Sequence, residues 1–232
     1  MKFALIGHPV EHSFSAQYLN SRFKNEGIDA HYELIDLPHI AEFPTLIQSN
    51  KYNGFNVTIP HKRAIIPYLD SLSPEATAIE AVNVIQITNN KLIGHNTDII
   101  GFHETLTPLL KPYHTHAVIL GTGGASQAVQ YVLQQLNIPF RLITHKELDA
   151  NTITQLAPII INTTPLGMHP NTNTKPNIDY SQITPNHLIY DLVYNPTETQ
   201  FLKLAKQQGA TTQNGLAMLH RQADAALKIW LK

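Results

Sequence analysis

The 232-residue chain contains no cysteine. This absence excludes disulfides, thiolate zinc sites and cysteine nucleophiles, and it fits a cytoplasmic protein. Charged residues make up only 14% of the chain, and 16 basic against 17 acidic residues leave a formal net charge of -1. Because no basic excess is available to neutralise phosphates, we expect no nucleic-acid partner.

Long hydrophobic runs are also missing. No run approaches the roughly 20 apolar residues of a membrane span, and the apolar start at residues 1–7 is too short for a signal-peptide core. We therefore expect a cytoplasmic protein without a membrane partner. Apolar residues still make up 43% of the chain, enough for a hydrophobic core in one large domain or two small ones.

Thirteen histidines raise the possibility of a metal site. No H-E-x-x-H motif is present, and His8 and His12 bracket a proline in an expected loop, so we predict no metal. Ser13 and Ser15 lack a G-x-S-x-G context, which argues against a serine hydrolase.

Short apolar runs alternate with helical patterns along the chain, which predicts an α/β fold with parallel strands and helical crossovers. In the first hundred residues we expect strands at 2–6, 32–37 and 55–59, helices at 13–25, 40–48 and 62–69, and a hairpin of 84–88 and 92–94 around Asn89-Asn90. Beyond residue 101 we expect strands at 117–120, 141–144, 159–162 and 188–193, and helices at 102–110, 128–136, 200–207 and 216–231.

A glycine-rich turn, Gly121-Thr122-Gly123-Gly124-Ala125, follows an expected strand and opens a helix. Such a turn lets the backbone approach a diphosphate, which the free amides and the helix dipole then hold. The spacing is not the full G-x-G-x-x-G, and close packing is an alternative reason for the glycines. The next strand ends in Thr144-His145-Lys146, where two potentially cationic groups favour a 2′-phosphate and hence NADP, unless both are ordinary surface residues.

Polar residues also follow the expected strands of the first half. Ser13 and Ser15 stand at a helix start, where they either cap the helix or help to hold a carboxylate. Lys62 follows the third strand, at the end of the sheet where ligands bind in open parallel sheets, although a single lysine is usually solvated.

Ordered motifs cover essentially the whole chain: G-x-P-x-x-H-S-x-S at 7–15, G-x-N-V-T-x-P-x-K at 54–62, A-V-N at 81–83, N-T-D at 96–98, I-N-T-T-P-x-G-M at 161–168, Y-D-L-V-Y-N-P at 190–196 and N-G-L-A-M-L at 214–219. In these motifs the chain resembles the shikimate dehydrogenase family.

The resemblance implies two domains: a substrate-binding, catalytic open α/β domain at 1–100 plus 213–232, and a trimmed, Rossmann-like NADP-binding domain at 101–212, with the substrate between them. It implies reversible NADP(H)-dependent reduction of 3-dehydroshikimate to shikimate, a step toward chorismate and the aromatic amino acids. Lys62 and Asp98 would be the catalytic pair. Substrate would contact Ser13, Ser15, Asn56, Thr58, Asn83, Tyr194 and Gln222. The cofactor would contact Gly121, Thr122, Gly123, Gly124, Ala125, Thr144, His145, Lys146, Thr163, Thr164, Val193 and Gly215.

The chain departs from the family pattern in three places. The family's arginine for the 2′-phosphate is missing at Thr144-His145-Lys146, which keeps NAD open as the cofactor. Too few residues separate this strand from Ile159 for the usual long helix plus an extra strand, so the cofactor domain looks trimmed. Glu80 and Ile99 stand where the family commonly has glycine, a residue that permits backbone conformations closed to others.

Two other functions remain open from the sequence alone. One is a paralogue that acts on quinate or shikimate and prefers NAD. The other is a non-catalytic, substrate-binding regulatory protein, against which Lys62 and Asp98 argue. The sequence leaves both a monomer and a homodimer open.

Overall fold

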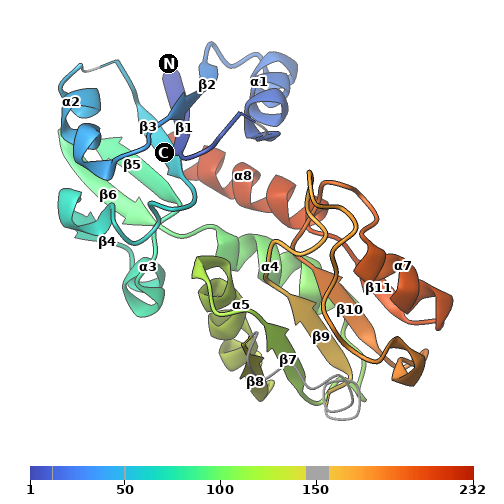
Figure 1. Ribbon diagram of the computed structural model, residues 1–232. Coiled ribbons are helices and arrows are strands. Elements are labelled where there is room, and N and C mark those ends of the chain that lie inside the picture. Colours follow the sequence, from blue (N-terminus) through green and yellow to red (C-terminus); the bar gives the residue numbers. More distant parts are fainter. Residues whose placement is uncertain (12, 50, 145–156) are drawn as a thin grey trace. The chain divides into compact units, whose positions relative to one another are not determined.

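The computed structural model describes residues 1–11, 13–49, 51–144 and 157–232. Contacts divide the chain into two compact units, Met1–Ile100 with His220–Lys232, and Gly101–Leu219 (Figure 1). The first change of unit follows residue 100, but the return lies at His220 and not at 213. Strand β11 (Thr211–Gln213) pairs with its neighbour in the second unit, so residue 213 belongs there and not to the first unit.

The sheet of the first unit contains six strands in the order β2-β1-β3-β5-β6-β4. β1, β2 and β3 are parallel, as expected, but β5 runs antiparallel to β3 and to β6, so the sheet is mixed. The strands are β1 (Lys2–Gly7), β2 (His31–Asp36), β3 (Gly54–Val57), β4 (Ser71–Leu72), β5 (Val84–Thr88) and β6 (Lys91–His95).

The predicted hairpin is confirmed. Thr88 pairs with Lys91, so Asn89 and Asn90 form a two-residue loop, and their φ angles are 49° and 60°. Both residues therefore adopt the left-handed conformation that a type I′ turn requires and that asparagine tolerates better than most residues.

Helices cover both faces of this sheet. One face packs against α1 (Ser15–Glu26) and α8 (Leu216–Trp230). The other packs against η1 (Ile40–Glu42), α2 (Phe43–Gln48), η2 (Ile66–Tyr68) and α3 (Pro74–Ile79). The expected helix at 62–69 is wrong: turns and the short η2 stand there, because Pro67 lacks the N–H that a continuous α-helix would need.

α8 is fixed to the sheet by its last turn. The Trp230 Nε1–H donates to the carbonyl of Ile85 at 3.0 Å, and the indole stacks on Phe3 with ring centroids 4.6 Å apart. Gly54 lies beneath the indole, and a Cβ at this position would stand 2.4 Å from Nε1 and 2.9 Å from the Ile85 oxygen. The glycine therefore lets the helix and the sheet approach closely.

The second unit has a five-stranded parallel sheet in the order β11-β10-β9-β7-β8. Its strands are β7 (Ala117–Leu120), β8 (Phe140–Ile143), β9 (Ile159–Asn162), β10 (Leu188–Asp191) and β11. Its helices are η3 (Thr107–Leu109), α5 (Gly124–Gln135), η4 (Tyr180–Gln182), α7 (Gln200–Gln207) and most of α4 (Asp98–Leu106). The expected trimmed crossover falls on 145–156, outside the described residues.

Opposite faces of this second sheet carry different helices. Phe201, Leu202 and Ala205 of α7 pack on Val118, Ile160 and Ile189, while Phe102 of α4 meets Tyr190 edge-on at 5.1 Å between ring centroids. A parallel sheet with helices on both faces is the doubly wound, Rossmann-like arrangement expected from the sequence.

The two departures from the family glycines have different structural consequences. Glu80 ends α3 with φ 50° and ψ 40°, the left-handed conformation that favours glycine, at a cost of about 1 kcal/mol. Ile99 lies in the first turn of α4 and is buried, so it needs no unusual conformation. Only the first position therefore shows the backbone that a glycine would suit.

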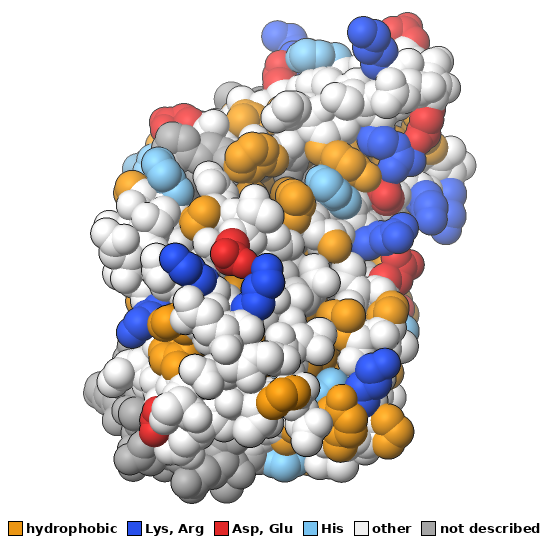
Figure 2. Space-filling view, turned by 90° about the vertical axis from the view of Figure 1, so that its right-hand side faces the viewer, with side chains coloured by type: hydrophobic (Ala, Val, Ile, Leu, Met, Phe, Trp, Pro, Cys, Tyr) orange, Lys and Arg blue, Asp and Glu red, His pale blue; other side chains and the backbone are white. Residues whose placement is uncertain are grey.

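Two further features concern the described residues as a whole. None of their helices is both long and apolar enough to pass through a lipid bilayer. Among these same residues, no three histidine or acidic side chains are grouped so that they could hold a metal ion. On the face shown in Figure 2, basic side chains lie interspersed with acidic ones.

The close approach at Gly54 predicts that Gly54→Ala destabilises the first unit by about 2–4 kcal/mol. The added methyl must displace Trp230 and break its hydrogen bond to Ile85. Gly124→Ala is the matched control, because a Cβ there meets nothing within 4 Å. Urea unfolding followed by far-ultraviolet circular dichroism measures both variants, because this signal reports on the helices of both units. Equal stabilities would contradict the packing described for α8.

Candidate functional site

Four strands of the first unit have one of their ends at the same edge of its sheet. β1, β3 and β6 run in one direction and reach this edge with their carboxyl ends, whereas β5 runs the opposite way and starts there. Residues after β3 and β6 therefore lie close to Asn83, which comes just before β5. The mixed direction of the sheet explains why Asn83 joins the site from the other end of a strand.

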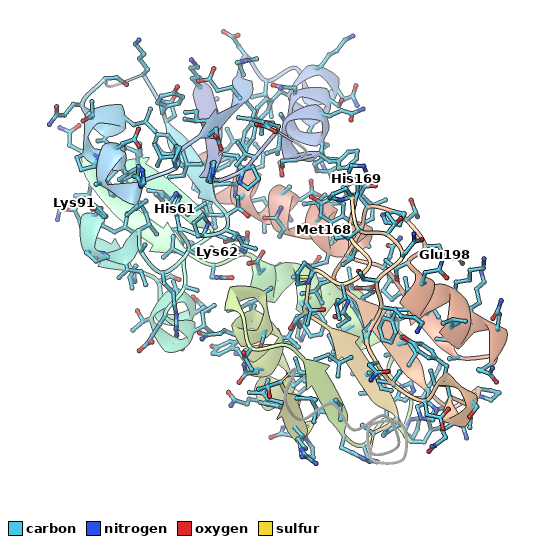
Figure 3. The ribbon with its side chains drawn as sticks, in the orientation of Figure 1. His61, Lys62, Lys91, Met168, His169 and Glu198 are labelled. Atoms are coloured by element: carbon cyan, nitrogen blue, oxygen red, sulfur yellow. The ribbon has the colours of Figure 1, made fainter. Side chains whose placement is uncertain are left out.

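Lys62 and Asp98 form an ion pair at this edge. Lys62 Nζ donates to Asp98 Oδ2 at 2.5 Å, with 17% and 12% of the two side chains exposed. Lys62 lies in the loop after β3, next to the buried His61 (Figure 3). Shielding from water strengthens such a pair, while the remaining exposure lets the ammonium meet a ligand.

The side-chain amide of Asn83 is held at both ends. Its Oδ1 accepts the backbone N–H of Thr97 at 2.7 Å, which fixes which end is oxygen. Its Nδ2 therefore faces the other way and donates to Asp98 Oδ1 at 3.0 Å and to Thr97 Oγ1 at 3.1 Å. Asn83 thus orients the carboxylate that pairs with Lys62.

Gln222 brings α8 to the same cluster. Its Oε1 lies 3.4 Å from both Asn83 Nδ2 and Thr97 Oγ1, and the side chain is buried. The backbone N–H of Asp98 donates to Asn96 Oδ1 at 3.1 Å, and Asn96 Nδ2 donates to the carbonyl of Ala81 at 3.0 Å. The A-V-N and N-T-D motifs therefore form one hydrogen-bonded structure.

The remaining expected substrate residues of the first unit lie at the start of α1, within β3 and just after β3. Ser15 is buried at the start of α1, where the N-cap position is taken by Phe14 and not by a serine. Ser13 Oγ accepts the Ser15 N–H at 3.3 Å. Thr58 follows β3 and packs against Gly7, whose added Cβ would lie 2.3 Å from the Thr58 methyl group. Asn56 is buried inside β3.

The glycine-rich turn of the second unit fits a diphosphate. Gly121 has φ +105°, and a Cβ there would stand 2.8 Å from Thr163 Oγ1, so the turn closes tightly on the end of β9. Gly123 and Gly124 have nothing within 4 Å of an added Cβ, so this side of the turn is open. α5 starts at Gly124 without a side-chain cap or an acid in its first turn, which leaves its amino end suited to an anion.

Other expected cofactor residues lie at the same edge. Thr163 Oγ1 donates to the carbonyl of Leu120, and Thr164 donates its N–H and hydroxyl to Asn162 Oδ1 at 3.0 and 2.6 Å. The Gly215 N–H donates to the carbonyl of Val193 at 3.1 Å, and a Cβ on Gly215 would stand 2.0 Å from the Leu192 oxygen. The loops after β7, β9, β10 and β11 therefore meet.

A buried carboxyl, Asp191, ties these loops together. It accepts hydrogen bonds from Asn162 Nδ2 at 2.9 Å, the Val193 N–H at 3.1 Å and Thr199 Oγ1 at 2.6 Å. Burial raises its pKa to about 6, although the three donors oppose this shift. Sequence analysis gave Asp191 and Asn162 no role, although both stand within the quoted motifs.

Four expected site residues lie elsewhere. Thr144 follows β8 directly, whereas His145 and Lys146 lie outside the described residues. Tyr194 belongs to the second unit and is half-buried, which raises the pKa of its hydroxyl. Sequence reasoning also assigned no role to Thr97, although the N-T-D motif contained it.

Comparisons with known proteins find both a matching family model and relatives of this chain. Residues 5–85 match the family model of the shikimate dehydrogenase substrate binding domain. The NADP(+) shikimate dehydrogenase of Methanococcus aeolicus is 37% identical over 97% of this chain and 90% of its own length.

Solved structures are similar as well. Shikimate 5-dehydrogenase of Thermus thermophilus, in complex with NADP(H) and shikimate, matches with a TM-score of 0.90 and 30% identity, covering 99% of this chain and 93% of that one. The Listeria monocytogenes enzyme, in complex with shikimate and NAD, has a TM-score of 0.85 and 26% identity over 99% and 91% of the two chains.

The raised pKa of Asp191 predicts a stability that falls with pH. The unfolded carboxyl loses its proton near its ordinary pKa of 3.8, whereas the folded one keeps it up to about 6. Stability is therefore full below pH 3.8, falls by about 3 kcal/mol as pH rises to about 6, and is then level. Urea unfolding between pH 4 and 7 should show this fall in the wild type and not in Asp191→Asn. Asp179→Asn changes a partly exposed carboxyl of the same unit whose pKa is lowered by hydrogen bonds from Ser181 and Gln182, so this variant should keep the fall. A fall shared by all three proteins would contradict the assignment.

Proposed function

We propose that this chain, which belongs to the shikimate dehydrogenase family, reversibly reduces 3-dehydroshikimate to shikimate with NADPH. The observation that carries the proposal is the Lys62–Asp98 ion pair, held by Asn83 at the edge of the first sheet. The proposal also draws on the printed activity of relatives that match nearly the whole chain. A cytoplasmic location is consistent with the absence of cysteine.

In this proposal Lys62 acts on the reacting oxygen. Reduction of a ketone places negative charge on its oxygen, and an adjacent ammonium stabilises this charge and donates the proton that completes the alcohol. In the opposite direction the neutral amine accepts the proton of the hydroxyl. The partial exposure of Lys62 supports this role, since its ammonium is held by Asp98 and still reachable.

Asp98 has two tasks in the same proposal. Its Oδ2 accepts from Lys62, so the carboxylate keeps the ammonium in place. Its Oδ1 accepts from Asn83, which prevents the carboxylate from turning away. Because both oxygens have partners of known direction, the pair is oriented before substrate arrives, and little reorganisation is needed during the reaction.

The substrate contacts are proposed from the same edge. Ser13 and Ser15 stand at the amino end of α1, where hydroxyls and the helix dipole suit a carboxylate. Thr58, Asn83 and Gln222 offer hydrogen bonds to ring hydroxyls. The family resemblance adds Tyr194 to the proposed substrate contacts. Asn56 supports Asn83 from inside the sheet.

NADP is the proposed cofactor, and it supplies the hydride when bound. The open amino end of α5 would hold the diphosphate, with Gly121, Gly123 and Gly124 giving the close approach. Loops ending in Thr163, Thr164, Val193 and Gly215 would border the same site. NADP is favoured over NAD by the names of the relatives at 37% and 39% identity.

We expect purified protein to reduce NADP⁺ in the presence of shikimate, measured at the absorbance band of the reduced nicotinamide. Turnover with NAD⁺, or with quinate in place of shikimate, should be at least about tenfold lower in kcat/KM, about 1.4 kcal/mol of discrimination. Preference for NAD⁺ or quinate would favour the paralogue, and no turnover with any pair would contradict the proposed function.

Lys62→Ala should lower kcat by about 10²–10⁴-fold, because the variant loses the proton donor, while shikimate binding changes far less. Lys91→Ala is the matched control: Lys91 lies exposed in the hairpin, and its loss should leave kcat unchanged (Figure 3). Steady-state kinetics gives kcat, and a shikimate titration gives binding. Near-normal turnover in Lys62→Ala would overturn the assignment.

A further inference from the structure

The hydrogen bonds that hold Asn83 continue away from the reacting groups into the core. Behind Asn83 stands Asn56 of β3, and behind Asn56 stands Tyr32 of β2, two strands away in the sheet order. Tyr32 is 1% exposed and Asn56 is 5% exposed, so water reaches neither side chain to any useful extent. Their polar atoms must therefore satisfy one another.

The directions of these bonds follow from donor and acceptor chemistry. The carbonyl of Asn83 can only accept, so Asn56 must present its Nδ2 there, at 3.0 Å. Asn56 Oδ1 then faces Tyr32, whose hydroxyl must donate, at 2.7 Å. Burial raises the pKa of Tyr32 well above its ordinary value, so the hydroxyl keeps the proton that this arrangement needs.

Tyr32 is itself fixed at its backbone. The side chain of Asn20 on α1 accepts the Tyr32 N–H at 2.9 Å and donates to the Tyr32 carbonyl at 2.8 Å. These two bonds occupy the backbone groups of Tyr32 at the outer edge of β2, the last strand of the sheet. Asn20 of α1 thus fixes the backbone of Tyr32, the residue at which the series of hydrogen bonds begins.

At its other end, this series of hydrogen bonds reaches the Lys62–Asp98 pair. The Asn83 carbonyl also accepts the Val57 N–H at 2.9 Å, so two donors hold its peptide group. The side chain of the same residue orients Asp98. Any shift of the Asn83 peptide therefore moves the amide that faces the carboxylate.

We infer that Tyr32 is a positioning residue for the reaction: through Asn56 it holds Asn83, and through Asn83 it holds Asp98 against Lys62. The inference rests on the proposed function. Tyr32 does not contact the reacting atoms in this scheme. Its role is to orient the side-chain amide of Asn56, so that Nδ2 faces the carbonyl of Asn83.

Three variants separate positioning from simple stability. Tyr32→Phe leaves Asn56 Oδ1 without its donor, and Asn56→Leu leaves the Tyr32 hydroxyl without its acceptor. The double variant Tyr32→Phe/Asn56→Leu leaves neither buried group unpaired, so its stability should recover toward that of the wild type. Its Asn83 carbonyl still lacks the Asn56 donor.

We expect kcat for shikimate oxidation to fall about five- to tenfold in all three variants, the double variant included. Tyr32→Phe should have no further effect on kcat in the Asn56→Leu background, since both act on the same path. KM for NADP⁺ should stay within about twofold, because the Tyr32 hydroxyl is buried in the core of the first unit and the proposed cofactor residues belong to the second. Tyr52→Phe is the matched control: it removes a tyrosine hydroxyl that donates to Glu33 in the same unit, and kcat should remain unchanged.

Other results would overturn the inference. If kcat recovers in the double variant together with the melting temperature, Tyr32 contributes only stability. If Tyr32→Phe lowers kcat by the same factor with and without Asn56→Leu, it acts by another path. The nuclear magnetic resonance signals of the Asn83 side-chain amide should shift in Tyr32→Phe and not in Tyr52→Phe. This readout needs no turnover, so an inactive wild type would contradict the proposed function alone, whereas an unmoved Asn83 signal would contradict this inference.

Discussion

The orientation of one buried side-chain amide, that of Asn83, is the constraint on which the candidate site depends. The Thr97 N–H can only donate and the Asp98 carboxylate can only accept, so the amide has one satisfactory orientation. In the low dielectric of the core, the opposite orientation would leave two buried groups facing like partners. The Lys62–Asp98 pair is therefore positioned by hydrogen-bond direction as well as by attraction between charges.

The second unit uses a similar arrangement for a different purpose. Asn162 lies at the end of β9, accepts from the loop that follows it and donates to Asp191 at the end of β10. Asp191 is fully buried and bonds to an amide, a peptide N–H and a hydroxyl, whereas Asp98, which is also buried, pairs with a lysine. This difference in partners suits Asp191 to holding loops and Asp98 to chemistry.

Sequence reasoning located most of the elements because their signals are local. The Asn89-Asn90 hairpin, the glycine-rich turn and the strand at 117–120 follow from turn chemistry and apolar runs, and the structure confirms them. The helix expected at 62–69 failed because Pro67 outweighs the apolar spacing around it. α3, β4 and β11 were missed, since short elements at sheet edges carry little pattern of their own.

The site shows the same limit at the level of single residues. Motifs pointed to Lys62, Asn83 and Asp98, and the structure brings these three together through hydrogen bonds. Tyr32 could not be found in this way, because one tyrosine in an expected strand looks like any other core aromatic. Its partner Asn56 stands two strands away, and only the tertiary structure shows that the two side chains meet.

α8 shows why the site needs the return of the chain to the first sheet. Gln222, Ala226 and Trp230 recur at intervals of four, so they lie along one stripe of the helix, which faces the sheet. Trp230 fixes the rotation of this stripe through Ile85 and through the space that Gly54 leaves. Two turns earlier, about 12 Å along the axis, the same rotation directs Gln222 toward Asn83 and Thr97. A packing contact between an indole and a glycine thus determines where a polar group of the site lies.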